Sequence, residues 1–552
     1  MLDRLARWQV TCRRSRARRV AHRRSAAGML TGRGIAVLTV ACLAAAMAAC
    51  SGTASAPRSA SPHLGLVVST TGGQIRGKHA GSTDDYLGIP YAAPPVGALR
   101  WQPPQPAPRW HGTRQATQFA PHCPQPTGVF GRPSTSENCL YLNVFRPAKQ
   151  SSSDLPVMFW IHGGGYVGGE SDDYDPAGLV KDGVIVVTIN YRLGALGFLA
   201  HPALASSPGG PTGDYGLMDQ QAALRWVRQN IRAFGGDPAN VTIFGESAGG
   251  QSVLLQLISP PARGLFAKAI AESGGYAQYP VSLASAEAQG QAFATKAGCP
   301  DQTAKCLRSL PVATILADQN QSGASADIDG LVLTQPLKQA LASGDFSHVP
   351  VIDGSNHDEW RLFVALATFE GQPVTAANYV STIESTLSVS PQIAATLALT
   401  YPLSAYQSPP LAMSALGTDG IFACPTLLLD QDMAKYTPTY AYEFNDENAP
   451  SGYPAAGFPY AAAHAAELQY LFGLPSPAAG TLSAQQQVLA AAMRAEWTSF
   501  AKSGAPSAPG AAPWSRFTTA DQRMESLVTP EPQPETSFAT DHHCALWALG
   551  GD

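Results

Sequence analysis

The run Gly245-Glu246-Ser247-Ala248-Gly249 has the G-x-S-x-G spacing that presents a serine nucleophile at a sharp turn. A β-type segment, 241–244, precedes this run, and a helix-compatible segment follows it. Turning from strand to helix strains the serine backbone, and the glycines two residues to either side relieve the crowding. The helix N-terminus then offers backbone N–H groups to a forming oxyanion. We therefore predict that Ser247 is a nucleophile; the alternative is an ordinary glycine-rich turn.

A second glycine run, His162-Gly163-Gly164-Gly165, ends another predicted strand upstream of the first motif. Consecutive glycines let the backbone approach a substrate closely and direct bare N–H groups at its carbonyl oxygen. A run of this kind before the nucleophile is the oxyanion-hole arrangement of esterases and lipases. Loss of one such donor typically costs about 3–4 kcal/mol of transition-state stabilisation. The alternative, a flexible loop, is weakened because both motifs occur together and in this order.

A serine nucleophile needs a base, and the base needs an acid that orients it. With a nucleophile on such a turn, the chain order is serine, acid, histidine. His464 lies in the small-residue loop "PYAAAHAAEL" beyond the last predicted strand, and we predict that it is the base. The other downstream histidines are interpreted as surface or loop imidazoles: His348, His357, His542 and His543.

The orienting acid is expected in the loop "GSNHDEWRLF" (354–363), which follows a predicted strand. Asp358 and Glu359 are adjacent there, and spacing alone does not separate them. Either one could instead be a solvated loop charge.

Strand and helix patterns alternate through the middle of the chain, which is typical of a mostly parallel sheet covered by helices. The helix is predicted over 217–234, where Ala223, Val227, Ile231 and Phe234 recur at helical spacing. The weakly patterned stretch 280–345 is expected to be an inserted helical cap. Strands are predicted within these segments: 155–165, 183–191, 241–244, 349–356 and 439–445.

Composition indicates a large globular body. The chain has 552 residues, of which 45% are apolar and 14% charged. The net charge of -4 conceals a split, because residues 1–49 carry ten arginines and one aspartate. The remainder has 26 basic and 39 acidic residues, and such an acidic body argues against a nucleic-acid partner.

The first fifty residues are typical of an export signal. An arginine-rich stretch precedes the apolar run 35–49, which is too short to span a bilayer and ends directly before Cys50. We predict a signal peptide over 1–49, a lipidated Cys50, a flexible tether over 50–63 and a single catalytic domain over 64–552. The protein would then be exported and would contact the membrane only through its lipid anchor. A soluble secreted form and a translation start at Met29 are alternatives.

Six cysteines remain after residue 50: Cys123, Cys139, Cys299, Cys306, Cys424 and Cys544. An even number in an exported protein predicts three disulfides, although six cysteines allow 15 connectivities. No pair has the C-x-x-C spacing of a zinc or redox site. Structural bridges are therefore expected.

The motifs resemble the type B carboxylesterase family, the cholinesterase-like branch of the α/β-hydrolases. The resemblance runs from about Val67 and includes "YLGIPYAAPPVGALRW" (86–101), "SENCLYLNVF" (136–145) and "IHGGGYVGG" (161–169). Its longest block is "GDYGLMDQQAALRWVRQNIRAFGGDPANVTIFGESAGG" (213–250). It implies an α/β-hydrolase fold, with a central mostly parallel sheet, flanking helices and large insertions.

The resemblance also implies roles for particular residues. It places the acid at Glu359 rather than Asp358, the base at His464, and the oxyanion donors at the N–H groups of Gly164, Gly165 and Ala248. It suggests three disulfide pairs: Cys123 with Cys139, Cys299 with Cys306, and Cys424 with Cys544.

Two departures from the family pattern affect the expected substrate. Trp360 stands where the family usually has glycine, so the acid loop is expected to turn differently. The short segment between Cys123 and Cys139 contains no tryptophan. In cholinesterases a tryptophan there holds the quaternary ammonium by cation–π attraction, so choline esters are poor candidates.

These features predict an esterase that acts on a small-molecule ester through an acyl-enzyme and needs no metal or cofactor. An amidase or carbamate hydrolase could use the same three residues. A non-catalytic binding protein of the same fold is a further alternative, which the complete set of catalytic residue types disfavours.

Overall fold

A computed structural model describes residues 65–128, 131–149, 154–205, 207, 210–319, 325–475 and 480–548. The predicted signal peptide 1–49, the lipidation site Cys50 and the tether 50–63 lie outside the described residues. The description of the catalytic body therefore begins at Gly65.

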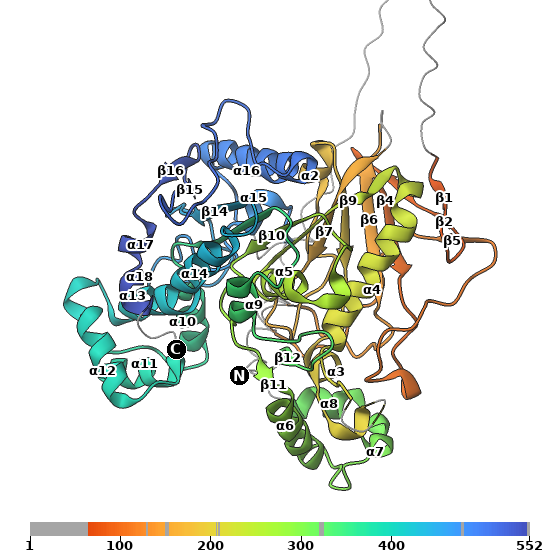
Figure 1. Cartoon of the computed structure of the whole chain (residues 1–552), viewed down its shortest axis with the longest axis horizontal. Helices are drawn as coiled ribbons and strands as arrows, with labels where there is room; N and C mark the ends of the chain where they lie inside the picture. Colours follow the sequence, from red (N-terminus) through yellow and green to blue (C-terminus); the bar gives the residue numbers. More distant parts are fainter. Residues whose placement is uncertain are drawn as a thin grey trace, which may run out of the picture. The chain divides into compact units, whose positions relative to one another are not determined.

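An 11-stranded sheet runs through the described body, in the order β16-β15-β14-β13-β10-β9-β7-β8-β6-β4-β3 (Figure 1). Antiparallel strands flank its parallel centre: β3 (Lys78–Ala80), β4 (Thr83–Pro90) and β6 (Tyr141–Pro147) at one edge and β16 (Gln533–Glu535) at the other. The parallel strands are β7 (Leu155–Ile161), β8 (Ile185–Ile189), β9 (Gly236–Glu246), β10 (Lys268–Glu272), β13 (Val351–Asn356), β14 (Thr439–Phe444) and β15 (Met524–Leu527).

The strand order reverses beside β7. The chain passes from β7 to β8 on one side of it, and β9 then pairs with β7 on the other side. In an open α/β sheet, ligands bind at the carboxyl ends of the strands where such a reversal occurs. Both glycine motifs follow these strand ends, since β7 ends at Ile161 and β9 at Glu246.

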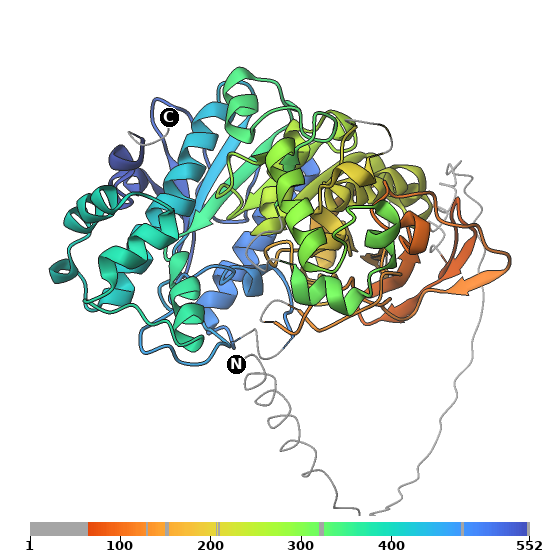
Figure 2. The same ribbon diagram turned by 90° about the horizontal axis from the view of Figure 1, so that it is seen from below.

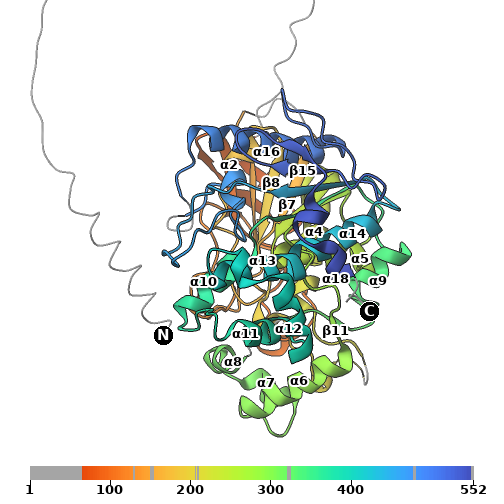
Figure 3. The ribbon, with the colours of Figure 1, turned by 90° about the vertical axis from the view of Figure 1, so that its left-hand side faces the viewer.

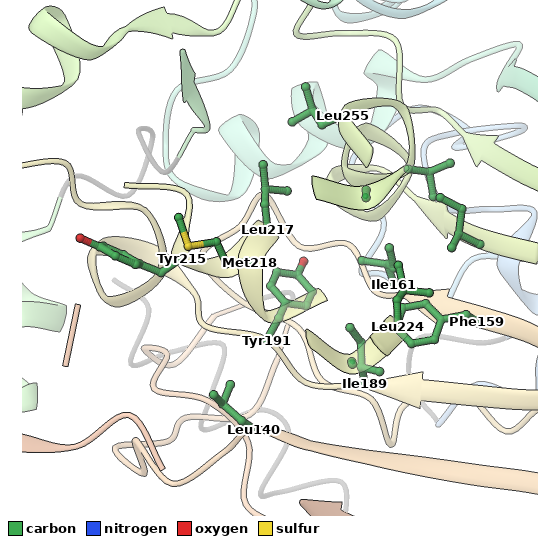
Figure 4. Close-up of a cluster of buried hydrophobic side chains, with 14 of the residues drawn as sticks. Leu140, Phe159, Ile161, Ile189, Tyr191, Tyr215, Leu217, Met218, Leu224 and Leu255 are labelled. Atoms are coloured by element: carbon green, nitrogen blue, oxygen red, sulfur yellow. The ribbon is translucent and has the colours of Figure 1, made fainter. Parts of the chain in front are cut away.

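Side chains of β7 alternate between two apolar cores, because successive residues of a strand point to opposite faces. Val157, Phe159 and Ile161 belong to one core, with residues of α4 (Tyr215–Asn230) and α5 (Ala248–Ile258); Figure 4 shows part of it. Met158 and Trp160 belong to the other, with α2 (Ala177–Lys181) and α16 (Ala484–Ser503). Helices therefore cover both faces of the sheet, and Figures 1 and 3 show α16 and α2 together on one side.

The predicted strands are confirmed as β7, β8, β9, β13 and β14. Strand β9 is longer than expected, because it begins at Gly236. The predicted helix 217–234 is observed as α4 followed by a 3-10 turn, Ile231–Phe234. The fold is the predicted α/β-hydrolase fold, a mostly parallel sheet flanked by helices.

Two helical insertions extend the body, and Figure 2 shows them as separate green and teal groups. The first falls within the predicted cap 280–345 and contains α6 (Leu283–Lys296), α7 (Ala304–Ser309), α8 (Val312–Asp318) and α9 (Leu337–Ser343). The second lies between β13 and β14 and was not predicted. It contains α10 (Trp360–Phe369), α11 (Tyr379–Leu387), α12 (Pro391–Thr400) and α13 (Pro409–Gly417), which share a small apolar core.

Helix α13 continues through a π-helical turn, Thr418–Ala423, into α14 (Cys424–Met433). This run, Pro409–Met433, is long and apolar enough to cross a membrane by length and composition. However, 67% of the most apolar 18-residue stretch of this run is buried inside the protein, which is typical of a core helix.

Three disulfides join the six cysteines in the pairs that the family resemblance implied. Cys123–Cys139 and Cys299–Cys306 close short loops, with sequence separations of 16 and 7. Cys424–Cys544 spans 120 residues and ties the C-terminal segment to the start of α14.

Candidate active site

Ser247 occupies the turn between β9 and α5. Its backbone has φ 58° and ψ -123°, a conformation that an L-residue adopts only when its surroundings enforce it. A hydrogen bond from its N–H to the carbonyl of Glu272 (2.8 Å) holds the turn. A Cβ at Gly245 or Gly249 would lie 2.5 or 1.9 Å from the carbonyl oxygen of Ile161, so only glycine fits beside this strand end. The strained serine is the feature expected of a nucleophile elbow.

The second glycine run follows β7 and lies against the elbow. A Cβ at Gly163 would be 3.0 Å from that of Ser247, so the two loops touch. Gly164 and Gly165 have positive φ angles of 103° and 62°, and the carbonyl of Gly164 accepts bonds from the N–H groups of Val167 and Gly168. Positive φ at two successive residues favours glycine in this loop.

His464 and Glu359 are hydrogen-bonded to each other. Nδ1 of His464 lies 2.5 Å from Oε2 of Glu359, and both side chains are buried. The second carboxylate oxygen of Glu359 accepts the backbone N–H of Asn356 at 2.8 Å. The carboxylate is therefore held at both oxygens, which fixes the ring orientation of the histidine.

Asp358 points elsewhere. Its carboxylate pairs with Arg361 at 2.7 Å, and its backbone N–H donates to the carbonyl of Ala462. The two adjacent acids that spacing left open are thus separated by the structure, which places Glu359 and not Asp358 at the imidazole.

The other nitrogen of His464 faces the nucleophile elbow. Nε2 lies 3.2 Å from Oε1 of Glu246, the residue directly before Ser247, but without hydrogen-bond geometry. Within the described residues Nε2 has no hydrogen-bond partner, so the bond from the Ser247 hydroxyl is not formed in this structure. Contacts of this kind are often long before substrate binds and tighten in the reacting complex.

Buried carboxyl groups surround the imidazole. Burial and the nearby Glu359 raise the pKa of Glu246 to about 7, although His464 opposes the shift. Burial also raises the pKa of Glu272 to about 8. For His464 burial favours the neutral ring, but the charges of Glu246 and Glu359 prevail and raise its pKa. Protonation of the ring is therefore electrostatically favoured. Sequence reasoning did not identify Glu246 as a neighbour of His464, because the G-x-S-x-G motif accepts any residue at that position.

Aromatic rings pack against the imidazole of His464. The ring centroids of Phe363 and Phe422 each lie 5.1 Å from the ring centroid of His464. The ring centroid of Trp360 lies 4.5 Å from that of Phe363. Phe363 comes from α10 and Phe422 from the π-helical turn. Their convergence depends on the second insertion, so sequence patterns did not reveal it.

Trp360 fits because a glycine lies beneath it. The acid loop passes from Glu359 directly into α10, and the backbone N–H of Trp360 donates to Oγ1 of Thr418 at 3.0 Å. A Cβ at Gly417 would lie 2.3 Å from the indole ring. The loop therefore enters a helix directly, with the indole packed on the bare backbone of α13.

Residues in and beside the loop closed by Cys123–Cys139 contact the glycine-rich turn that follows β7. Gln125, two residues after Cys123, accepts the N–H of Gly169 at 2.8 Å and donates to its carbonyl at 3.1 Å. His122 pairs with Glu170 at 2.9 Å. The loop therefore stabilises the glycine turn from outside.

The sheet with a strand reversal, the strained serine after β9 and the glycine loop after β7 define an α/β-hydrolase. Residues 65–547 match the family model described as "Carboxylesterase family". The chain belongs to the carboxylesterase family and is a carboxylic ester hydrolase.

Relatives with established names cover most of the chain. The fumonisin B1 esterase of Sphingopyxis macrogoltabida is 37% identical, over 82% of this chain and 84% of the relative. The para-nitrobenzyl esterase of Bacillus subtilis (strain 168) is 34% identical, over 85% of this chain and 97% of the relative. The cocaine esterase of Oryctolagus cuniculus is 35% identical, over 85% of this chain and 92% of the relative. A solved structure titled "PNB esterase" superposes with a TM-score of 0.75 at 32% identity, over 87% of this chain and 99% of that one.

Proposed function

We propose that the chain hydrolyses esters through an acyl-enzyme, with Ser247 as nucleophile, His464 as general base and Glu359 as the acid that orients it. The observation that carries this proposal is the 2.5 Å bond between Glu359 and Nδ1 of His464, which leaves Nε2 directed at the elbow. The strained backbone of Ser247 supports the same assignment.

In the first half-reaction, Oγ of Ser247 forms a bond to the ester carbonyl carbon, and its proton passes to Nε2 of His464. The carbonyl oxygen becomes an oxyanion, and the N–H groups of Gly164, Gly165 and Ala248 stabilise it. The carbon–oxygen bond to the alcohol then breaks, and the proton on Nε2 passes to the leaving oxygen. Buried Glu359 stabilises the transient imidazolium throughout.

In the second half-reaction, a water molecule replaces the alcohol. His464 takes a proton from the water, whose oxygen attacks the acyl carbon. The bond to Oγ then breaks, Ser247 recovers its proton from Nε2, and the carboxylic acid leaves. No step needs a metal or cofactor.

Esters with an apolar group near His464 fit this proposal, because Phe363 and Phe422 make the surroundings of that ring apolar. Choline esters remain poor candidates, since the segment between Cys123 and Cys139 contains no tryptophan for cation–π binding. The relatives are named for fumonisin B1, a para-nitrobenzyl ester and cocaine. Because these names differ so widely, the proposal extends to small-molecule carboxylic esters as a class.

Hydrolysis of p-nitrophenyl acetate, butyrate and octanoate by the purified protein tests this proposal. We expect turnover by the wild type and a loss of about 10⁴-fold or more in Ser247→Ala. Glu359→Gln should lose much of the activity, whereas the adjacent control Asp358→Asn should stay close to wild type.

Matched anilides in the same assay address the amidase alternative, which would be supported by faster amide than ester cleavage. A folded wild type that is inactive on every ester and anilide would contradict the proposal and favour a binding protein of this fold.

We further propose that the protein is exported and anchored through lipid on Cys50. The three disulfides support export, because such bonds persist in oxidising compartments. Labelling cells with a fatty-acid probe tests the anchor, since the wild type should carry the label and Cys50→Ala should not. An unlabelled wild type in the culture medium would support the soluble secreted form instead.

A further inference from the structure

A second group of ionisable side chains lies behind the acid loop, with His542 at its centre. Nδ1 of His542 is 2.6 Å from Oδ1 of Asp419, and Nε2 is 2.6 Å from Oε1 of Glu443. The ring is 3% exposed, and the two carboxylates are buried as well. His542 was interpreted from the sequence as a surface or loop imidazole; it lies in the turn after α17, but its side chain is buried rather than at the surface.

Both nitrogens of His542 must carry protons, because each lies against a carboxylate oxygen that can only accept. Burial opposes the charged ring, but the hydrogen bonds to Asp419 and Glu443 prevail and raise the pKa of His542 to about 10. Burial likewise opposes the charge on Glu443, yet His357 and His542 lower its pKa to about 2. The ring is therefore a buried imidazolium between two carboxylates.

Each of the two carboxylates that bind His542 lies next to, or itself makes, a hydrogen bond to the loop that carries Glu359. Asp419 follows Thr418, whose hydroxyl accepts the backbone N–H of Trp360 at 3.0 Å. Glu443 binds Nδ1 of His357 at 2.9 Å, and the carbonyl of the next residue accepts the N–H of His357 at 3.0 Å. The acid Glu359 lies between His357 and Trp360, so the two contacts hold the loop on both sides of it.

The chain segment that carries His542 is itself anchored. His542 follows α17 (Phe538–Asp541), and Cys544, two residues further on, is bonded to Cys424. Cys424 begins α14 directly after the π-helical turn that contains Asp419. The disulfide therefore holds the imidazolium next to one of its two carboxylates.

We propose that His542 is a positioning residue for ester hydrolysis, which links Asp419 to Glu443 and thereby holds Glu359 at its bonding distance from His464. The inference rests on the proposed function of Glu359 and His464. His542 does not touch the reacting atoms and acts only through the acid loop.

Other charged and titratable groups face this network from the elements around it. His543 lies 3.2 Å from Oδ2 of Asp419, and the hydroxyl of Tyr401 donates to the same oxygen at 2.8 Å. From β16, Glu535 lies near Glu443, and burial together with that neighbouring charge raises the pKa of Glu535 to about 7. On the acid loop, Asp358 adjoins His357 and is paired with Arg361.

The pH profile of His542→Gln tests the proposal. Glutamine retains one donor for Glu443 but loses the charge and the bond to Asp419. We expect kcat on p-nitrophenyl butyrate to fall about 10- to 100-fold with KM nearly unchanged, because the acid and not the substrate is displaced. The acidic limb of kcat/KM, which reports the pKa of His464, should move to lower pH, since a displaced Glu359 stabilises the imidazolium less.

His348→Gln is the control. Its ring is exposed, bonds the backbone carbonyl of Gly344 and has no carboxylate partner among the described residues. This variant should keep the wild-type profile. A purely structural role for His542 would lower the melting temperature of His542→Gln without moving the acidic limb, and that result would overturn the proposal.

His357→Ala provides a second variant should His542→Gln not fold. His357 is half-buried, and its removal cuts the link between Glu443 and the acid loop while the buried imidazolium remains. We expect a smaller shift of the limb in the same direction, and an unchanged profile would overturn the proposal. An inactive wild type would instead reject the proposed function, so the two failures are distinguishable.

Discussion

Glu246 places its carboxylate oxygen Oε1 3.2 Å from Nε2 of His464, the nitrogen to which the proposed mechanism transfers the proton of Ser247. Glu246 therefore acts on the imidazole from one side, while Glu359 binds its opposite nitrogen. Two carboxyl groups thus share one imidazole, and only Glu359 has the geometry of a hydrogen bond to it. This arrangement makes the protonation state of Glu246 part of the pH dependence of the site.

Replacing Glu246 should lower the pKa of the base. The charge of Glu246 helps to raise the pKa of His464, so Glu246→Gln removes one source of that shift. We expect the acidic limb of kcat/KM for ester hydrolysis to move to lower pH. The limb can be measured from pH 4 to 9 (roughly the range in which His and buried Glu groups titrate). Glu384→Gln, on α11, is a control with no contact to the site, and a limb that moves to higher pH in Glu246→Gln would contradict the argument.

The fit of Trp360 over Gly417 can be tested by a double-mutant cycle. A Cβ at Gly417 would lie 2.3 Å from the indole, so Gly417→Ala should displace Trp360 and cost about 1–3 kcal/mol of stability through overpacking. In a Trp360→Ala background the same change should cost far less, because the clash is gone. Urea unfolding of the four proteins measures both costs. Equal costs in the two backgrounds would show that the two residues are not coupled.

The long-range disulfide should stabilise the fold more than the short one. In the chain-entropy account, closing the 120-residue separation of Cys424–Cys544 contributes about 5 kcal/mol, against about 2 kcal/mol for the 7-residue separation of Cys299–Cys306. We therefore expect the double alanine variant of Cys424 and Cys544 to unfold at clearly lower urea concentration than that of Cys299 and Cys306. The reverse order would mean that strain or denatured-state structure dominates.

The buried imidazolium makes stability depend on pH in a defined window. The pKa of His542 is raised to about 10 from an unfolded value of about 6.5. The contribution of His542 to the free energy of unfolding is thus complete below about pH 6.5 and is lost as pH rises through 10. The pKa of Glu443 is lowered to about 2, so its contribution is present above about pH 4.3 and is lost as pH falls through 2.

Urea unfolding at pH 6, 8 and 10 (roughly the span of the His542 titration) measures this effect. The difference in unfolding free energy between wild type and His542→Gln should narrow as pH rises. His348→Gln should show no such trend, because its exposed ring bonds the backbone carbonyl of Gly344 and packs on Phe346 and Tyr436 rather than on a carboxylate. A difference that stays constant from pH 6 to 10 would mean that His542 is not charged in the folded protein.

Much of the fold could be predicted from local patterns, because each depends on neighbouring residues. Apolar runs of strand length predicted β7, β8 and β9, and helical spacing predicted α4. The second insertion, α10 to α13, was not predicted, because its helices are short and bury their apolar residues mainly against one another. Strand β9 begins earlier than its apolar pattern, because Gly236 pairs with Leu155 of β7 across a register shift.

The two glycine motifs at the proposed site could be predicted from local sequence. The glycine spacing around Ser247 and after His162 depends on steric limits within a few residues, and so it can be recognised without a structure. Local patterns do not show how distant groups meet. Spacing left Asp358 and Glu359 open until the family resemblance favoured Glu359, and it is the folded chain that brings Glu359 to His464, Glu246 to the same ring, and His542 between Asp419 and Glu443. These partners are separated by 99 to 218 residues, and the folding of strands and insertions around them, rather than any local periodicity, brings them within hydrogen-bond distance.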